Sequence, residues 1–362
     1  MMTYNPRNER IKRDYFILLK QADQMADSTV DGIRKALSRY EDFTVWEDFT
    51  SFEKERAIGF KKHLTKLHAV RSDKPLSRAT VYSTVQAVQA FFRWLSRQPG
   101  YRSKIAPGDI RYFNLSRKDV AIATSNRTKR FPTLEQVNAT LAAMPATTEI
   151  EMRDRALFAF AILTGIRDSA ISSLRLKHID IHQRLVIQDP SEVKTKFSKR
   201  IETFFFTSVG PDAERIVTEW IAFLKEEKLY GNDDPLFPRA KVIASKMNGF
   251  MCDGLEPMPW SSAGQIRQIF KSAFAHAGIP YFNPHSFRDT LTILGEQVCR
   301  TPEEFKAWSQ NLGHESPLTT FTSYGKVSLH RQGELIRNAS RKEGQDEKLD
   351  RLMEMMTRIQ AG

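Results

Sequence analysis

Apolar side chains recur every three or four residues through the N-terminal part of the chain, a spacing that places them on one face of an α-helix. The clearest stretch predicts a helix from Ser77, a suitable N-cap residue, to Leu95. Its apolar positions are Val81, Val85, Val88, Phe92 and Leu95. Pro99-Gly100 predicts its end, and a second helix is predicted over 51–70, with apolar residues on one side and lysines on the others.

A polar and basic segment at 123–130 separates two regions rich in apolar residues, and we interpret it as a linker. Directly after it, Thr133 and Gln136 have the spacing of a capping box that opens a new helix. A chain of 362 residues is also long for a single core. The sequence therefore predicts two domains that meet at about residue 127.

The second part begins with helical spacing and then changes period. The predicted elements are helices over 133–144, 153–163 and 168–174, short strands around Leu185 and Ile187 and over 203–206, and helices again from Trp260 onward. The strands flank a basic segment at 193–200. The predicted fold class is α+β, mostly helical, with a small β-sheet in the second domain.

The C-terminal segment 341–362 predicts one more helix. Its apolar positions are Leu349, Leu352, Met353, Met356 and Ile359. A helix with a single apolar stripe needs a surface to cover it. That surface is either a neighbouring protomer or the helix's own domain.

Composition limits the classes of function. Hydrophobic residues make up 41% of the chain, which is enough for packed cores and excludes wholesale disorder. The net charge of +12 suits a nucleic-acid backbone, although a solvated basic surface has the same composition. Cys252 and Cys299 form no Cys-x-x-Cys pair, and there is no secretion signal and no apolar run of membrane-spanning length. We therefore expect a cytosolic protein with no membrane partner.

Candidate chemistry gathers in the C-terminal half, at His285, Arg288, His314 and Tyr324. The carboxylates and thiols that would complete a metal site are missing from this stretch, so neither a metal nor another cofactor is expected. The set does match phosphoryl transfer to a tyrosine, which needs a nucleophile, fixed positive charge and proton carriers that titrate near neutrality. The upstream segment Thr164-Gly165-Ile166-Arg167 adds a second guanidinium.

The physical demands of phosphodiester cleavage fit these residue types. A guanidinium donates two hydrogen bonds at once and keeps its charge, so two arginines can clamp the phosphate. Tyrosine has a pKa near ~10, so surrounding cations must favour its phenolate. The leaving 5′ oxygen needs a proton, which a lysine or an imidazole can supply.

A second histidine pair has the spacing of a helical metal site. It consists of His178 and His182. The apolar residues around the pair alternate like a turn that leads into a strand, so we reject a metal site there.

In this order and spacing, the motifs resemble those of the tyrosine recombinases, also called phage integrases. Thr164-Gly165-Ile166-Arg167 resembles the first arginine box and His285-Ser286-Phe287-Arg288 the second. Leu312-Gly313-His314 followed by Tyr324 resembles the third. Each box alone is weak, but their order and spacing together are specific.

The resemblance implies an enzyme that cuts and rejoins DNA strands. Tyr324 would attack the scissile phosphate and form a 3′-phosphotyrosyl link, and strand exchange would pass through a Holliday junction without ATP. The implied domains are a helical core-binding, DNA-binding domain at 1–126, a catalytic domain at 127–340 and a tail helix at 341–362. The implied partners are double-stranded DNA, further copies in a tetramer, and accessory DNA-bending or directionality factors.

The resemblance also assigns the remaining positions. Arg167 and Arg288 would hold the non-bridging oxygens of the phosphate. Lys196, in the turn between the strands, would be the general acid for the 5′ oxygen. His285 would assist proton transfer to or from the tyrosine, and His314 would hydrogen-bond the phosphate.

The sequence departs from the family pattern in three places. Ala170 stands where the family often has a carboxylate, and Asp168 is a possible substitute. Tyr324 follows the histidine of the third box by ten residues, where nine is usual. Lys194 competes with the favoured Lys196 as the general acid. Ala170 and the shifted Tyr324 keep open a second interpretation, a DNA-binding protein of the same fold with little or no catalytic activity.

Overall fold

The computed structural model describes residues 4–68, 73–125, 130–195, 199–245 and 249–313. The chain forms two compact units, Met1–Ser125 and Asn126–Gly362. Each unit has a hydrophobic core of its own. The predicted boundary between residues 126 and 127 lies outside the described residues and stays a prediction.

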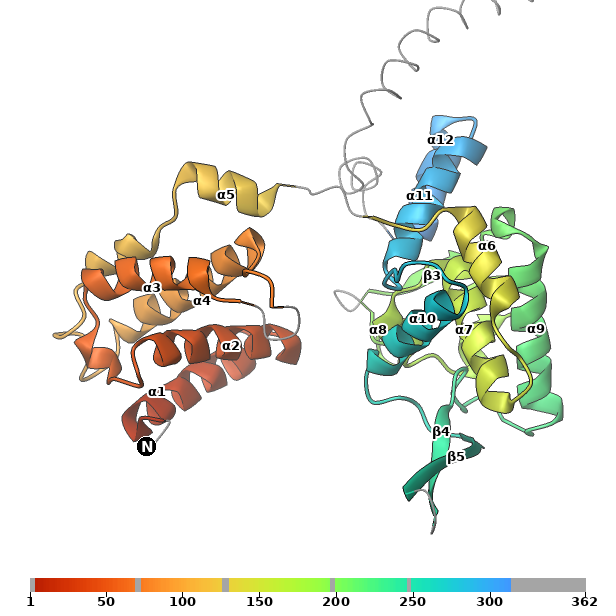
Figure 1. The fold of residues 1–362 in the computed structure, drawn as a ribbon, viewed down its shortest axis with the longest axis horizontal. Coiled ribbons are helices and arrows are strands. Elements are labelled where there is room, and N and C mark those ends of the chain that lie inside the picture. Colours follow the sequence, from red (N-terminus) through yellow and green to blue (C-terminus); the bar gives the residue numbers. More distant parts are fainter. Residues whose placement is uncertain (1–3, 69–72, 126–129, 196–198, 246–248, 314–362) are drawn as a thin grey trace, which may run out of the picture. The chain divides into compact units, whose positions relative to one another are not determined.

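The first unit is built from helices (Figure 1). Its α-helices are α1 (Pro6–Ile17), α2 (Asp27–Phe43), α3 (Lys54–Lys66), α4 (Arg78–Leu95) and α5 (Arg117–Thr124). Short turns of other helix types lie at Leu18–Ala22, Phe49–Ser51 and Asp109–Phe113. Helix α4 confirms the prediction from Ser77, whose hydroxyl accepts the Thr80 N–H at 3.1 Å.

Helix α3 is shorter than the predicted helix over 51–70. Ser51 belongs to the preceding turn, Phe52 is extended, and the helix begins at Lys54. The Phe52 ring stacks on Phe92 at 4.2 Å between centroids. Packing into the aromatic core therefore takes Phe52 out of the helix, a tertiary effect that helical spacing does not encode.

The second unit combines seven described α-helices with small antiparallel sheets (Figure 1). The helices are α6 (Leu134–Ala143), α7 (Glu149–Thr164), α8 (Asp168–Ile171), α9 (Pro211–Glu226), α10 (Gly264–His276), α11 (Ser286–Val298) and α12 (Pro302–Asn311). The predicted capping box at Thr133 and Gln136 is present. Helix α7 begins earlier than predicted, at a further capping box of Thr148 and Glu151, and α8 ends at Ile171.

The main sheet has the strand order β1 (Ile179–Asp180), β2 (Leu185–Gln188), β3 (Ile201–Phe204), all antiparallel. The strand predicted over 203–206 overlaps β3 only in part, because Phe205 and Phe206 leave the strand and are buried in the core. A second hairpin, β4 (Arg239–Ser245) and β5 (Gly249–Glu256), extends away from the helices and was not predicted (Figure 1). The predicted α+β, mostly helical class is confirmed.

Helix α7 is the central element of the second core. Every residue from 156 to 164 is buried, which suits a helix that is apolar on all sides. Phe158 packs against Phe270 of α10 and Phe287 of α11, with ring centroids 4.8 and 5.0 Å apart. The C-terminal end of α7 thus carries the first arginine box out of a rigid core. No described helix has both the length and the apolarity needed to cross a bilayer.

Candidate active site

The first box is a helix end that turns sharply. Helix α7 stops at Thr164, whose hydroxyl donates to the Phe160 carbonyl at 2.7 Å. Gly165 then takes the left-handed conformation with φ +62°, and its N–H bonds to Ala161 at 2.9 Å. Glycine adopts this conformation without the strain that a Cβ brings. The turn redirects the chain so that Arg167 follows directly.

Arg167 opens helix α8 and is half-buried. Its carbonyl accepts the N–H groups of Ala170 and Ile171 at 2.9 and 3.0 Å, which fixes its backbone. Ala170, at the position where a carboxylate was expected from the resemblance, is buried in the core. Asp168 is bonded to Arg267 of α10, with 3.0 Å between Oδ2 and Nε.

The second box begins helix α11. The Asn283 carbonyl accepts both the N–H and the hydroxyl of Ser286, at 2.9 and 2.6 Å. Phe287 is fully buried and anchors the start of the helix in the core. His285, one residue before the helix, is exposed, whereas Arg288 is only 3% exposed. Within four residues, the chain therefore places the imidazole of His285 at the surface and the guanidinium of Arg288 in the interior.

Arg288 connects the three boxes. Its Nη1 donates to the carbonyl of Gly165 at 2.7 Å, and its Nη2 donates to the carbonyl of Leu312. The first carbonyl lies two residues before Arg167, and the second lies two residues before His314. We call this group of Arg288, Gly165 and Leu312 the arginine junction. It brings together segments that are 123 and 24 residues from Arg288 in sequence.

The third box is attached to the sheet as well as to Arg288. The side-chain amide of Asn311 bonds to both backbone groups of Phe204 in β3: Oδ1 accepts its N–H at 2.7 Å, and Nδ2 donates to its carbonyl at 2.9 Å. Gly313 has φ +70°, and a Cβ there would lie 3.3 Å from Ile201 of β3. The end of α12 thus joins the hairpin strand to the junction.

The structure describes Arg167, His285 and Arg288 among the six predicted site residues. The other three are Lys196, His314 and Tyr324, which lie outside the described residues, as does the predicted tail helix at 341–362. The competing Lys194 is described and exposed, and its Nζ lies 3.4 Å from the carbonyl of Ser261. The backbone of the first box and Arg288 of the second therefore meet at one place in the fold.

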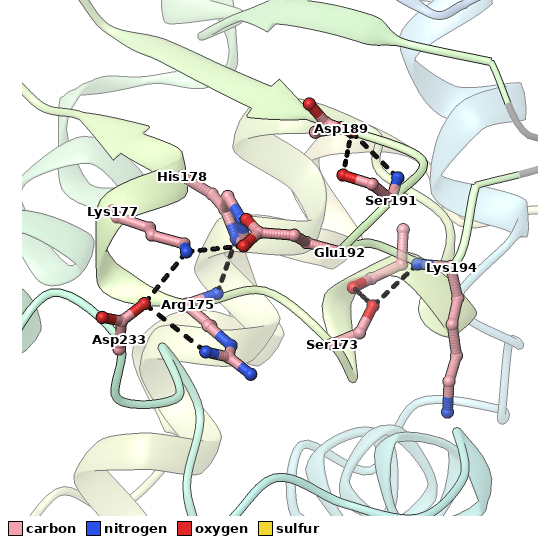
Figure 2. A network of polar contacts seen from close by, with 10 residues as sticks. Ser173, Arg175, Lys177, His178, Asp189, Ser191, Glu192, Lys194 and Asp233 are labelled. Atoms are coloured by element: carbon pink, nitrogen blue, oxygen red, sulfur yellow. Dashed lines mark hydrogen bonds and ion pairs between the residues drawn. The ribbon is translucent and has the colours of Figure 1, made fainter.

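Two contributors were not found from the sequence. Asn311 carries no motif signal, since its role depends on where β3 lies. His178 was considered only as a metal ligand, yet both of its ring nitrogens are in hydrogen bonds, to Arg175 N at 2.9 Å and to Glu192 at 2.8 Å (Figure 2). It lies at the end of a short helical turn, Leu176–His178, and not on one helix with His182.

Sequence comparison decides the family. A sequence model of the phage integrase family matches residues 130–330, the region that contains all three boxes. The chain belongs to the phage integrase family. Membership identifies it as a tyrosine-type site-specific recombinase, an enzyme that acts on DNA.

Curated relatives of this integrase family member are distant in sequence. The tyrosine recombinase XerC of Lactobacillus delbrueckii subsp. bulgaricus is 20% identical over 327 residues, which cover 88% of this chain and 95% of the relative. The tyrosine recombinase XerC of Natranaerobius thermophilus is 24% identical over 178 residues, which cover 48% of this chain and 53% of the relative.

Solved structures share the fold. A lambda integrase dimer bound to a COC′ core site matches with a TM-score of 0.60 at 11% identity, over 89% of this chain and 96% of that one. The XerH recombinase bound to a palindromic difH substrate matches with a TM-score of 0.57 at 16% identity, over 92% and 85%. The Tn1549 transposon integrase in complex with transposon right end DNA matches with a TM-score of 0.54 at 16% identity, over 91% and 99%.

Proposed function

We propose that this recombinase cuts each DNA strand with Tyr324, holds the 3′ end as a phosphotyrosyl ester, and exchanges strands through a Holliday junction. The observation that carries the proposal is the arginine junction, in which Arg288 bonds to the carbonyls of Gly165 and Leu312. Those contacts tie the segments of all three boxes to a single guanidinium. An ester of this kind stores the energy of the broken bond, so rejoining needs no ATP.

Arg167 and Arg288 bind the non-bridging oxygens of the scissile phosphate. A guanidinium has five N–H donors, so bonds to two carbonyls are compatible with binding a phosphate. Their fixed charge stabilises the additional negative charge of the transition state and favours the phenolate of Tyr324. His285 moves the proton of the tyrosine, and His314 hydrogen-bonds the phosphate. The exposure of His285 supports a role at the DNA surface.

Lys196 is the general acid that gives a proton to the leaving 5′ oxygen. In sequence it lies between the end of β2 and the start of β3, where the resemblance expects this lysine, and this position supports the role. The contact of the Lys194 Nζ with the Ser261 carbonyl supports Lys196 over Lys194, because Lys194 is already engaged with the segment before α10.

The working assembly is a tetramer on double-stranded DNA. Residues 1–126 grip the DNA as the core-binding domain, 127–340 form the catalytic domain, and the tail helix at 341–362 docks on a neighbouring protomer. Accessory DNA-bending or directionality factors join this complex, which acts with the nucleoid in the cytoplasm. The match to a transposon integrase supports a place in a mobile genetic element.

Covalent capture tests the proposal. The full chain is incubated with a library of duplexes that carry a randomised segment and a nick, so that the cleaved fragment diffuses away and the adduct accumulates. Wild type is expected to form an SDS-stable protein–DNA adduct that enriches one duplex sequence. Tyr324→Phe is expected to form none, whereas Tyr281→Phe, which alters an exposed tyrosine of the second unit, should retain it. A wild type that binds DNA but forms no adduct would establish the non-catalytic alternative.

A further inference from the structure

Side-chain hydrogen bonds hold the first half of the loop that joins β2 to β3. Glu192 of this loop accepts a hydrogen bond from Lys177 Nζ at 2.6 Å and lies 2.8 Å from His178 Nε2 (Figure 2). Both partners belong to the turn Leu176–His178, which precedes β1. One carboxylate of the loop is therefore held by two side chains of a separate segment.

The hydrogen bonds of His178 fix its ring. The Arg175 N–H donates to Nδ1 at 2.9 Å, so Nδ1 is the acceptor nitrogen of a neutral imidazole. The proton then lies on Nε2 and is donated to Glu192. The side chain is only 6% exposed, so packing prevents the ring from turning away. His178 is thus a rigid donor aimed at the loop.

Two further contacts hold the next residues of the loop. Val193 is 2% exposed and belongs to the core of the second unit. The Lys194 N–H donates to the Ser173 hydroxyl at 3.0 Å, as Figure 2 shows. Ser173 lies two residues after the end of α8, the helix that begins after Arg167. The loop is therefore held at three consecutive residues, and the last of them, Lys194, bonds to the segment that follows the first arginine box.

Charge reinforces the contact to Glu192. Hydrogen bonds from Lys177 and from His178 hold the pKa of Glu192 below its ordinary value, so it stays ionised at neutral pH. Lys177 is itself oriented by Asp233, with 2.9 Å between Nζ and Oδ1. We call Ser173, His178 and Glu192 the hairpin anchor. It ends at the backbone of Lys194, two residues before Lys196.

We propose that the hairpin anchor is a set of positioning residues for the general-acid lysine, an inference that rests on the proposed function. In cleavage, the proton of Tyr324 passes to His285, the Tyr324 oxygen bonds to phosphorus, the bond from phosphorus to the 5′ oxygen breaks, and a lysine Nζ proton passes to that oxygen. The lysine acts only within hydrogen-bond reach of the oxygen. The anchor fixes the first half of the loop relative to Arg167, which binds the phosphate in the proposed function. It therefore determines how far the lysine lies from the 5′ oxygen.

The anchor's location favours a role in geometry over one in stability. The Glu192 side chain is 39% exposed, and exposed ion pairs contribute little to folding. Small misplacement of a catalytic group, in contrast, lowers rates by about a hundredfold. Breaking the anchor should therefore slow the chemical step in a protein that remains folded.

The test uses the full chain and the duplex enriched by covalent capture, in two chemical forms. One form has the natural 5′ oxygen at the scissile phosphate, and the other has sulfur in its place. A thiolate is a far better leaving group than an alkoxide and needs no proton, so the sulfur form does not require the general acid. The variants are Glu192→Ala and Ser173→Ala. The matched control is Glu202→Ala, which removes an exposed glutamate that pairs with Arg200 of the same hairpin.

Both anchor variants are expected to form adduct about 10–100-fold more slowly on the oxygen form and at close to the wild-type rate on the sulfur form. The control should match wild type on both. Anchor variants that are equally slow on both forms, or that match wild type on both, would overturn the inference. If wild type itself forms no adduct on either form, the proposed function fails, and that result is distinct from either of these.

Discussion

The arginine junction and the hairpin anchor hold catalytic candidates by opposite means. In the junction, a guanidinium that is 3% exposed bonds to two backbone carbonyls. In the anchor, a carboxylate whose side chain is 39% exposed accepts hydrogen bonds from a half-buried lysine and a buried histidine. The first group is part of the core, and the second rests on it.

This difference in burial predicts different effects of mutation on protein stability and on DNA cleavage. A buried charge that loses its hydrogen-bond partners is strongly destabilising, so changes in the junction should affect both stability and cleavage. Exposed ion pairs contribute little to stability, so changes at Glu192 should affect cleavage far more than folding. A junction variant that keeps its stability, or an anchor variant that loses much of it, would contradict this comparison.

The largest effect is expected for Arg288→Lys. Lysine keeps the charge but lacks the planar fork that reaches both the Gly165 and Leu312 carbonyls. We expect a loss of about 3–6 kcal/mol in the free energy of unfolding, because two hydrogen bonds to a charged group are lost and each contributes about 1.5–3 kcal/mol. Adduct formation should also fall below detection. Urea unfolding and covalent capture measure the two effects.

The control for this variant is Arg267→Lys, at a surface arginine that is 59% exposed and pairs with Asp168. It should change the free energy of unfolding by less than about 1 kcal/mol. If Arg288→Lys were as stable as Arg267→Lys, the junction would not be a core element, and the comparison would fail.

Gly165→Ala should have the next largest effect. A Cβ at Gly165 would lie 2.8 Å from Leu291 and 2.9 Å from Leu312, in a residue with φ +62°. Left-handed strain costs about 1–2 kcal/mol and overpacking about 1–3 kcal/mol, so we expect a loss of about 2–5 kcal/mol in unfolding free energy. Gly278→Ala is the matched control, because Gly278 has φ +67° but no neighbour within 4 Å. Equal losses in the two variants would show that crowding at the junction is unimportant.

Asn311→Asp tests the link between the two regions, since Asn311 joins α12 to β3. The carboxylate cannot donate to the Phe204 carbonyl, so we expect a loss of about 1–2 kcal/mol in the free energy of unfolding. Thermal unfolding at fixed pH measures it. Asn138→Asp serves as control, because its Nδ2 makes only a long bond of 3.4 Å to Val209. A larger loss in the control would contradict the role given to Asn311.

The smallest effect concerns pH and Glu192. Its pKa lies below the ordinary 4.5 in the folded protein because Lys177 and His178 donate to it. A carboxylate of this kind stabilises the fold above its unfolded pKa, and that contribution is lost as pH falls through the lowered folded value. The difference in Tm between wild type and Glu192→Gln should therefore be small and constant from about pH 6 to 8, and should vanish in acid. A difference that grows as pH falls would contradict the anchor as described.

Local signals made much of the fold predictable. Helix α4 from Ser77 and the capping box at Thr133 are contained in a few neighbouring residues, and both predictions are confirmed. Helix α9 and the β4–β5 hairpin were not predicted, although the sequence of each element is as fully known as that of α4. The start of α3 after Phe52 depended on the packing of Phe52 against Phe92, which no local window contains.

The sequence by itself determined the order of the three boxes and the residue types that we propose for the chemistry, because those motifs are short and carry distinctive side chains. Only the tertiary structure decided what Arg288 bonds to and what holds the hairpin loop. The partners of Arg288 are backbone carbonyls, which every residue possesses. The identities of Gly165 and Leu312 therefore do not predict that they accept these hydrogen bonds. Likewise, the sequence argued only that His178 is not a metal ligand, and the fold showed that its ring bonds to Glu192 instead.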